Sequence, residues 1–351
     1  MVRTAAPAAH GVAARDVVFA TAGATQAGSP AHQLLAHKEP LKRAQPHRGR
    51  FVLRGGFPFS LVIAKPTVLR LGLAAAVATT FLAGCAAHYR ASDFVRAGPG
   101  GPFDTTQALA LLPSGCRVET GSVATPDGER LYRVASMHPQ ARSDLLLFGG
   151  NLFRSDTHAA FAARHVQAAW RGNLVLYDYR GRGQSSGVPS VAALRSDALL
   201  AFDTEMACLT RAGRKLALGG CSLGGVMAAA VTDQRTPAAL LLLATTTDAR
   251  EHADAVMPWY AKRLVRLQID PEVAAVDNRR ALRRYTGPLL VAVGADDRAT
   301  PPALSKRLYE AAATPAEHKQ IHVLPGVGHN NLLAADEFGR ALSQFMQAHG
   351  L

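Results

Sequence analysis

The fold of this chain is decided by one stretch, Leu216-Ala217-Leu218-Gly219-Gly220-Cys221-Ser222-Leu223-Gly224-Gly225. It begins as a short apolar run typical of a buried strand and passes through Gly-x-Ser-x-Gly into small residues that suit a helix packed on a sheet. A sharp turn of this kind strains the backbone at the serine and lifts its hydroxyl clear of the main chain. The N–H of Leu223, at the start of the helix, can stabilise a developing oxyanion. The stretch therefore predicts that Ser222 is a nucleophile.

A second Gly-x-Ser-x-Gly pattern occurs at residues 183–187, around Ser185. It lies several residues beyond the preceding strand, in a loop rich in arginine and glycine, and no helix begins at Ser185. A nucleophile needs the direct strand-to-helix junction that only Ser222 has. Ser185 is therefore predicted to be a loop serine.

The formal net charge of +13 would suit a nucleic-acid binder if it were spread over the fold. However, residues 1–84 hold ten Lys and Arg against two acidic residues, so only a small excess is left for the 267 residues that follow. No RNA- or DNA-binding module, phosphate-cradling glycine loop or metal-ligand spacing occurs in the sequence. We therefore expect no nucleic-acid partner, no cofactor and no metal.

A basic region containing Lys65 and Arg70 precedes an uncharged run at 71–84, which ends in Leu82-Ala83-Gly84-Cys85. The run is too short to span a bilayer and has the length of a signal-peptide core. Its end resembles the lipobox of bacterial lipoproteins. That resemblance implies that Cys85 is acylated and becomes the mature N-terminus, which would anchor the chain in the bacterial cell envelope on the periplasmic side. The alternative is a buried helix that ends in an ordinary core cysteine.

The chain is expected to divide into four parts. Residues 1–60 show no sustained hydrophobic period and are predicted to be a disordered leader, or to lie upstream of the true start. Residues 61–84 are the predicted lipoprotein signal peptide. Residues 85–112, which contain glycine and proline, are a predicted flexible tether. Residues 113–351 form the predicted catalytic domain.

Within that domain the hydrophobic pattern predicts an α/β fold. Two amphipathic strands at 117–123 and 130–136 suggest a hairpin around the turn at 125–128. Buried strands then alternate with helices, which indicates a mostly parallel sheet opened by an antiparallel hairpin. The strands are predicted at 144–148, 173–177, 215–219, 238–243, 288–294 and 320–324, and the helices at 158–170, 191–212, 225–234, 301–313 and 334–349. Residues 245–286 interrupt the alternation and are predicted to form a small helical cap at the carboxyl ends of the strands.

This order of elements resembles the α/β-hydrolase fold over about residues 116–351, and within that fold the BEM46-like group of serine hydrolases. Four motifs carry the resemblance: Phe148-Gly149-Gly150-Asn151, Asp178-Tyr179-Arg180-Gly181-Arg182-Gly183-Gln184-Ser185-Ser186-Gly187, Gly220-Cys221-Ser222-Leu223-Gly224-Gly225 and Gly328-His329-Asn330. The resemblance implies a catalytic triad in the chain order serine, acid, histidine.

A serine hydroxyl needs a base within reach and an acid that fixes the tautomer of that base. Asp297 follows an apolar strand and matches the family spacing from Gly294, so we favour it over Asp296 as the acid. His329 follows a glycine in the loop after the last strand, and we favour it as the base. The competing histidines lie within the last strand, in a charged turn and in the cap, at His322, His318 and His252 respectively.

The oxyanion hole needs a second donor besides the N–H of Leu223. The resemblance implies the loop after residue 148, where we favour the backbone N–H of Asn151. The sequence departs from the family at Gly149, where histidine is usual, and the two glycines could instead serve only close packing. Asp178 and Arg180 are predicted to have structural roles.

These features together predict a lipid-anchored serine hydrolase that cleaves carboxylic ester or thioester bonds of a small-molecule acyl substrate through an acyl-enzyme. A peptidase or an acyltransferase would use the same triad. A lipoprotein that keeps the fold but only binds a ligand is a further alternative, which the departure at Gly149 leaves open.

Apolar residues at 257–267 could line an acyl pocket while the basic residues among them face an anionic membrane, or this segment could simply pack on the domain.

Cys221 is expected to be buried and inert. A disulfide between Cys116 and Cys208 is compatible with an oxidising compartment, but the sequence does not show that they meet.

Overall fold

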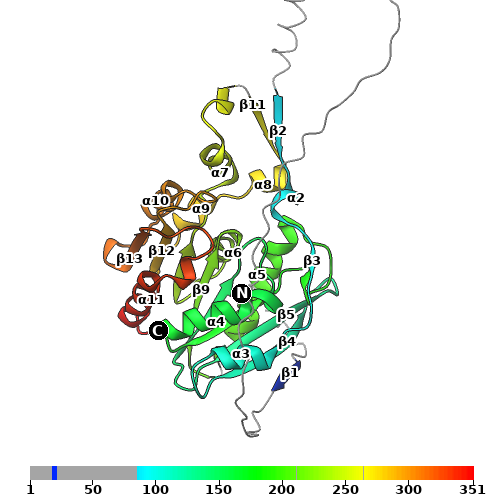
Figure 1. Ribbon diagram of the computed structural model, residues 1–351, viewed down its shortest axis with the longest axis vertical. Helices are drawn as coiled ribbons and strands as arrows, with labels where there is room; N and C mark the ends of the chain where they lie inside the picture. The colour runs from blue at the N-terminus through cyan, green and yellow to red at the C-terminus, as the bar shows by residue number, and fades with distance from the viewer. Residues whose placement is uncertain (1–17, 22–84, 211, 264) are drawn as a thin grey trace, which may run out of the picture. The chain divides into compact units, whose positions relative to one another are not determined.

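A nine-stranded sheet organises the part of the chain that the computed structural model describes, namely residues 18–21, 85–210, 212–263 and 265–351 (Figure 1). Its strand order is β1-β4-β5-β7-β6-β9-β10-β12-β13. The predicted signal peptide at 61–84 and most of the predicted leader at 1–60 lie outside the described residues.

The sheet is opened by antiparallel strands and continues as a parallel sheet. β4 (Arg117–Ala124), β5 (Arg130–Met137) and β7 (Asn173–Tyr177) pair antiparallel in that order. The parallel part contains β6 (Ser143–Phe148), β9 (Lys215–Cys221), β10 (Ala239–Leu243), β12 (Leu289–Gly294) and β13 (Lys319–Leu324). β6, β10 and β12 are buried throughout, as expected for parallel strands covered on both faces. The predicted mostly parallel sheet opened by a hairpin is confirmed.

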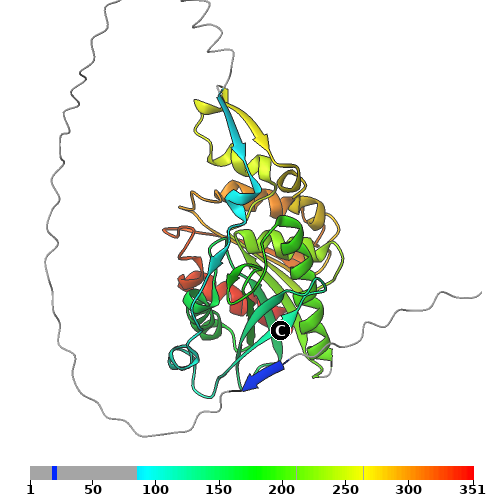
Figure 2. The same ribbon diagram turned by 90° about the vertical axis from the view of Figure 1, so that its right-hand side faces the viewer.

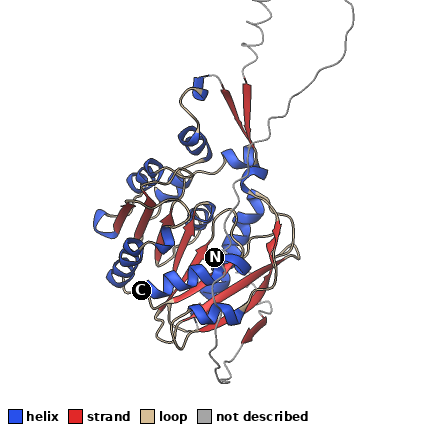
Figure 3. Cartoon of the chain, in the orientation of Figure 1, coloured by secondary structure: helices blue, strands red, loops and turns tan. Residues whose placement is uncertain are grey.

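Helices cover both faces of this sheet (Figure 3). They are α4 (Ser155–Ala169), α5 (Val191–Thr210), α6 (Leu223–Thr232), α10 (Pro302–Ala311) and α11 (Asp336–Ala348). Short 3₁₀ turns, η2 (Ala316–His318) and η3 (Leu332–Ala334), precede β13 and α11. These bounds confirm the helices expected from the sequence.

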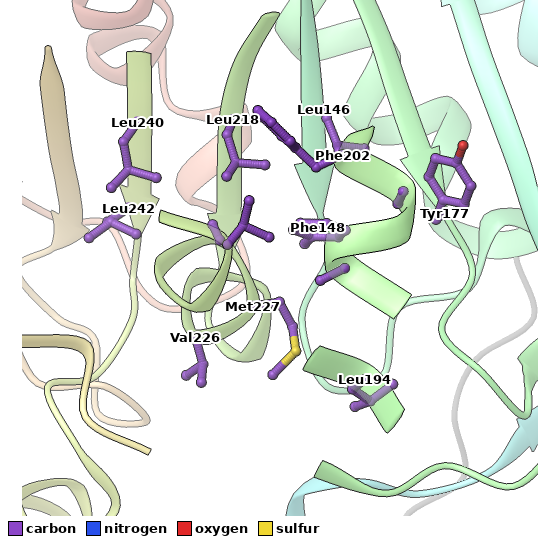
Figure 4. Packing of buried hydrophobic residues seen from close by; sticks show 14 of the residues in the cluster. Leu146, Phe148, Tyr177, Leu194, Phe202, Leu218, Val226, Met227, Leu240 and Leu242 are labelled. Carbon is purple, nitrogen blue, oxygen red and sulfur yellow. The ribbon is translucent and has the colours of Figure 1, made fainter. Parts of the chain in front are cut away.

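Alternation of side chains along the strands divides the core into two clusters. One cluster joins Leu146, Leu218 and Leu240 to Phe202 of α5 and Met227 of α6 (Figure 4). The other joins the alternate positions of the same strands to α4 and α11, among them Leu145, Ala217, Leu241, Val166, Phe338 and Phe345. The sheet is thus held between two apolar layers, and this fixes the strand ends that carry the site.

The segment predicted as a flexible tether at 85–112 is folded, and that prediction is wrong. It contains β2 (Cys85–Tyr89), α2 (Ala91–Phe94), β3 (Gly98–Pro99) and α3 (Thr105–Leu111). β3 pairs with β8 (Arg182–Gly183), and a Cβ atom at Gly100 would lie 2.8 Å from the Cα of Gly183. Gly100 thus serves close backbone approach rather than flexibility, a role that composition alone does not reveal.

The predicted leader also contributes one strand to the sheet. β1 (Val18–Thr21) pairs antiparallel with β4 and so covers its outer edge. Pairing of this kind protects backbone groups that an edge strand would otherwise expose. Residues 18–21 therefore differ from the expectation that residues 1–60 contain no regular structure.

The predicted cap at 245–286 contains a strand as well as helices. Its elements are α7 (Ala249–Val256), η1 (Ala261–Arg263), β11 (Val265–Ile269), α8 (Pro271–Ala274) and α9 (Asn278–Leu282). β11 pairs in parallel with β2, and the two strands lie side by side in both views (Figure 2). Within the described residues, no helix has the length and apolar character needed to cross a membrane.

Candidate active site

Ser222 occupies the turn between β9 and α6. Its φ of 53° and ψ of −116° form a strained conformation that few non-glycine residues adopt. Two hydrogen bonds hold the turn: the N–H of Ser222 donates to the carbonyl of Leu243 at 2.8 Å, and the hydroxyl of Thr245 donates to the carbonyl of Ser222 at 2.7 Å. The Ser222 side chain does not cap α6, so its hydroxyl is not committed to the helix.

The glycines around Ser222 are required by close backbone approach. A Cβ atom at Gly220 would lie 2.0 Å from the carbonyl oxygen of Gly224, and one at Gly224 would lie 2.0 Å from the carbonyl oxygen of Phe148. No other side chain fits at either position. The strand, the tight turn and the helix predicted from residues 216–225 are therefore present as expected.

Asp297 and His329 meet beyond the ends of two neighbouring parallel strands, β12 and β13. The Nδ1 atom of His329 lies 2.8 Å from Oδ2 of Asp297. Asp297 is buried whereas Asp296 is exposed. Asp297 is thus the aspartate that contacts His329, and an Nδ1–H that donates to it leaves Nε2 able to accept a proton.

Three groups of the loop after Asp297 also bind its carboxylate. The backbone N–H groups of Ala299 and Thr300 donate to Oδ1 at 2.9 and 2.8 Å, and the hydroxyl of Thr300 lies 2.8 Å from Oδ2. Burial raises the pKa of Asp297, but the hydrogen bonds from His329 and Thr300 outweigh it, and the pKa is below its ordinary value. The carboxylate is therefore charged at neutral pH. The contact of Thr300 with this carboxylate was not predicted from the sequence.

A cavity of about 350 Å³ lies beside Ser222 and His329. Most of its lining is apolar, from the strand ends, the loop after β6, α4 and η3: Leu147, Leu152, Phe153, Phe161, Leu176, Leu332 and Leu333. Among the hydrogen bonds of the described residues, none joins the Ser222 hydroxyl to His329. Both side chains border the same cavity, and such contacts often tighten only when substrate binds.

The other histidines considered from the sequence do not border this cavity. His322 lies in β13 beside Gln320, and His318 is exposed in η2. His252 of α7 contacts the carbonyl of Ala299 at 2.7 Å, on the loop that holds Asp297. His158 of α4 does border the cavity, and the sequence pattern gave no sign of it because it lies on an ordinary amphipathic helix.

The loop after β6 passes directly beside the serine. A Cβ atom at Gly150 would lie 3.7 Å from that of Ser222. Asn151 follows, borders the cavity, and is fixed through its side chain by Arg182, whose Nη2 donates to Oδ1 at 2.7 Å. Leu223 begins α6, so its N–H has no acceptor within that helix. The two predicted oxyanion donors thus belong to segments that flank Ser222.

The departure from the family at Gly149 has a steric cause. A Cβ atom at this position would lie 2.1 Å from Cγ of Phe153. The ring of Phe153 therefore occupies the space that a histidine side chain would need. The loop is held instead by Tyr179, whose hydroxyl donates to the carbonyl of Gly149 at 2.6 Å.

The remaining motif residues have structural roles. Arg180 is buried and pairs with Asp127 and with Asp197, the latter at 2.7 Å. Ser185 accepts the N–H of Tyr132 and donates to the carbonyl of Asp178, both at 2.8 Å. The hydroxyl of Ser185 is therefore used within the fold, as its loop position predicted.

The cysteines supply no further reactive group at this site. Burial raises the pKa of Cys221 to about 12, so it remains a thiol. Cys116 is a free thiol, so it forms no disulfide with Cys208. In the described ranges, no three His, Cys, Asp or Glu side chains gather in a way that could hold a metal ion.

Comparison with known proteins finds a matching family model and several relatives. The model of the prolyl oligopeptidase family matches residues 201–348, which include Ser222, Asp297 and His329. An uncharacterised protein of Mycobacterium tuberculosis is 32% identical over 271 residues, which cover 76% of this chain and 89% of that protein. Protein bem46 of Schizosaccharomyces pombe is 27% identical over 60% of this chain and 69% of its own length.

Two further matches extend the comparison. The lysophosphatidylserine lipase ABHD12 of Rattus norvegicus is 29% identical over 50% of this chain and 48% of its own length. Among solved structures, the Pyrococcus furiosus esterase Pf2001 superposes with a TM-score of 0.54 at 13% identity, covering 73% of this chain and 98% of that one. At this low identity, the match to the esterase structure shows only a shared fold.

Proposed function

This chain belongs to the α/β-hydrolase family, and from that premise we propose that it is a lipid-anchored serine hydrolase that cleaves carboxylic ester or thioester bonds. The observation that carries the proposal is the 2.8 Å contact between His329 and Asp297, at a cavity that Ser222 also borders. The strained backbone at Ser222 adds support, because such conformations persist mainly where function requires them.

The proposed reaction begins with attack of the Ser222 hydroxyl on the substrate carbonyl. Nε2 of His329 takes the hydroxyl proton as the new C–O bond forms, and the carboxylate of Asp297 stabilises the resulting imidazolium. The N–H groups of Leu223 and Asn151 bind the oxyanion of the tetrahedral intermediate. When the intermediate collapses, His329 gives its proton to the leaving alcohol or thiol, and Ser222 holds the acyl group. Water then releases the acid by the same steps.

The cavity beside Ser222 favours an acyl substrate. Its volume lies at the lower end of the range for small-molecule sites, and its walls are mostly apolar, with leucine and phenylalanine as their largest side chains. Such walls accept a hydrocarbon chain and offer few partners for a polar side chain. The relative named as a lysophosphatidylserine lipase supports the same substrate class.

A peptidase is the second candidate, since the matching family model is that of prolyl oligopeptidases. It would use Ser222, Asp297 and His329 in the same roles, with an amine as the leaving group. A substrate screen of the purified protein separates the two candidates. An esterase should prefer esters of increasing chain length, and a peptidase should prefer short peptides.

The proposed lipid anchor is Cys85. Acylation there would hold the chain in the bacterial cell envelope, facing the periplasm. Its support is the sequence Leu82-Ala83-Gly84-Cys85 after a short apolar run. Two or more acyl chains suffice for stable anchoring.

A fluorophosphonate probe tests the catalytic proposal. The full chain should be labelled, and Ser222→Ala should abolish the label. Ser185→Ala is the matched control, because it alters the other Gly-x-Ser-x-Gly pattern and should leave the label in place. If the folded wild-type protein is not labelled, the enzyme proposal fails and a ligand-binding role remains.

A further inference from the structure

Two large aromatic side chains project from the cap into solvent. Trp259 is 82% exposed and Tyr260 is 60% exposed, and their rings contact each other edge to face. Single exposed apolar residues are ordinary on protein surfaces, but adjacent aromatic residues at this exposure often mark an interaction site. Together with Lys262, Arg263 and Arg266 they form a surface that we call the cap tip.

The cap tip is basic. Residues 257–269 include Lys262, Arg263 and Arg266 and contain no Asp or Glu. All three basic side chains are exposed, and none forms an ion pair with another described residue. Their charge is therefore available to a negatively charged partner.

The register of the cap strand places this surface at the start of β2. Cys85 pairs with Val265 and Tyr89 pairs with Ile269, so the Cys85 end of the ribbon adjoins η1 and the cap tip. At the other end, Tyr89 and Ile269 pack against the main core. Val265 belongs to neither apolar cluster of the described residues. A two-stranded ribbon has little stability without a surface to cover it.

We propose that the cap tip is a membrane-contact surface that docks on an anionic lipid bilayer. Tryptophan and tyrosine are favoured at the membrane–water interface, because the ring lies among apolar groups while the N–H or O–H stays hydrated. Each Lys or Arg near an anionic surface strengthens membrane binding roughly fivefold. The proposed acylation of Cys85, on which this part of the argument rests, would hold the tip at the bilayer. An acyl anchor and a basic patch then act together.

Fluorescence of Trp259 tests this directly. The chain has two tryptophans, and the other, Trp170, is buried, so its emission is a constant background. The full chain is mixed with phosphatidylcholine vesicles that contain phosphatidylglycerol. We expect a blue shift, quenching by brominated lipids and loss of quenching by aqueous acrylamide. Trp259→Phe should remove all three signals. Emission that stays water-like on membrane-bound protein overturns the proposal and leaves a protein partner as the occupant of the cap tip.

The charges are tested with a matched pair of triple variants. Neutralising Lys262, Arg263 and Arg266 to glutamine should raise the lipid concentration for half-maximal shift about a hundredfold on vesicles with phosphatidylglycerol. The effect should fade in high salt. The control changes Arg117, Arg142 and Arg171 to glutamine. These residues are exposed and lie at the amino ends of β4, β6 and β7, whereas the cap lies beyond the carboxyl ends of the parallel strands. An equal loss in the control overturns the proposal, because binding then depends only on total charge.

The same samples separate this proposal from the proposed function. Each variant is also assayed for hydrolysis of a short water-soluble ester, which needs no membrane. The Cys85→Ser chain, which cannot be acylated at that position, should retain the lipid-dependent signal of Trp259. A chain that hydrolyses the ester but shows no lipid-dependent signal retains its function and lacks the surface. A chain that shows the lipid-dependent signal but does not hydrolyse the ester retains the surface and lacks the proposed function.

Discussion

The Nδ1 atom of His329 lies 2.8 Å from Oδ2 of Asp297, although the two residues are 32 positions apart in the chain. The contact forms because β12 and β13 are parallel neighbours, so the loops that follow them leave the sheet at the same edge. Ser222 follows β9, which is two strands from β12 in the same sheet. The sheet order thus brings an acid, a base and a hydroxyl to one edge.

Replacing Asp297 with asparagine should lower kcat/KM for an ester by about a thousandfold or more. An amide that donates to Nδ1 would leave Nε2 protonated and unable to accept the serine proton. The rate of fluorophosphonate labelling should fall in parallel. Asp296→Asn is the control, since Asp296 is exposed, and should retain near wild-type activity. Equal losses in the two variants would contradict the assignment.

Thr300→Val should lower stability at neutral pH and make it less sensitive to acid than that of the wild type. The folded-state pKa of Asp297 is depressed, so its contribution to stability is present above the unfolded-state pKa of about 3.9 and is lost as pH falls through the folded value. Removing the Thr300 hydroxyl takes away one hydrogen bond to the carboxylate and brings the folded pKa closer to the unfolded one. The gap in Tm between wild type and variant should therefore be largest near pH 7 and shrink below about pH 4.

Thr300 also bonds the carbonyl of Ala244, an interaction that does not titrate. Loss of that bond predicts a gap in Tm that is constant with pH. A gap that does not change from pH 7 to pH 3 would show that Thr300 acts only through Ala244.

The parallel strands and the Asp297–His329 contact could be predicted because their signals are local. Apolar runs mark buried strands, and Gly294 and Gly328 fix where Asp297 and His329 leave the sheet. Thr300 was missed because a threonine after an aspartate is ordinary in loops. Its hydroxyl contacts both Asp297 and the carbonyl of Ala244, and Ala244 follows another strand, β10.

The ribbon of β2 and β11 could not be predicted, for a different reason. Residues 265–269 alternate apolar and polar side chains as a strand should, but their partner lies 180 positions earlier, in a segment whose composition suggested a tether. A two-residue period indicates a strand without indicating its partner. The same limit applies to β1, which pairs with β4 across about 100 residues.

Cys85→Ser should abolish acylation and release the chain from the membrane fraction of a bacterial host in high salt. Metabolic labelling with palmitate reports the acyl chains, and fractionation reports the anchor. Cys116→Ser is the matched control because Cys116 is a free thiol within the domain. Palmitate label that persists in Cys85→Ser would place the acylation elsewhere and remove the support for the proposed anchor.

Gly149→Ala should destabilise the protein by about 1–3 kcal/mol, because the added methyl group would lie 2.1 Å from the ring of Phe153. The displaced loop also carries Asn151, so kcat should fall as well, by up to about a hundredfold for a misplaced oxyanion donor. Gly98→Ala is the control, since a Cβ atom there meets nothing within 4 Å. Chemical denaturation measures the unfolding free energy of each variant.

A double-mutant cycle then identifies the cause. Phe153→Gly removes both the ring and its Cβ atom, which would itself lie 2.4 Å from the new methyl group. Alone it should destabilise the protein, because Phe153 is buried. If the two residues compete for the same space, the double variant should be more stable than the sum of the single effects predicts. Additive effects would mean that Gly149 is required by something other than Phe153, and the steric reason for the missing histidine would be lost.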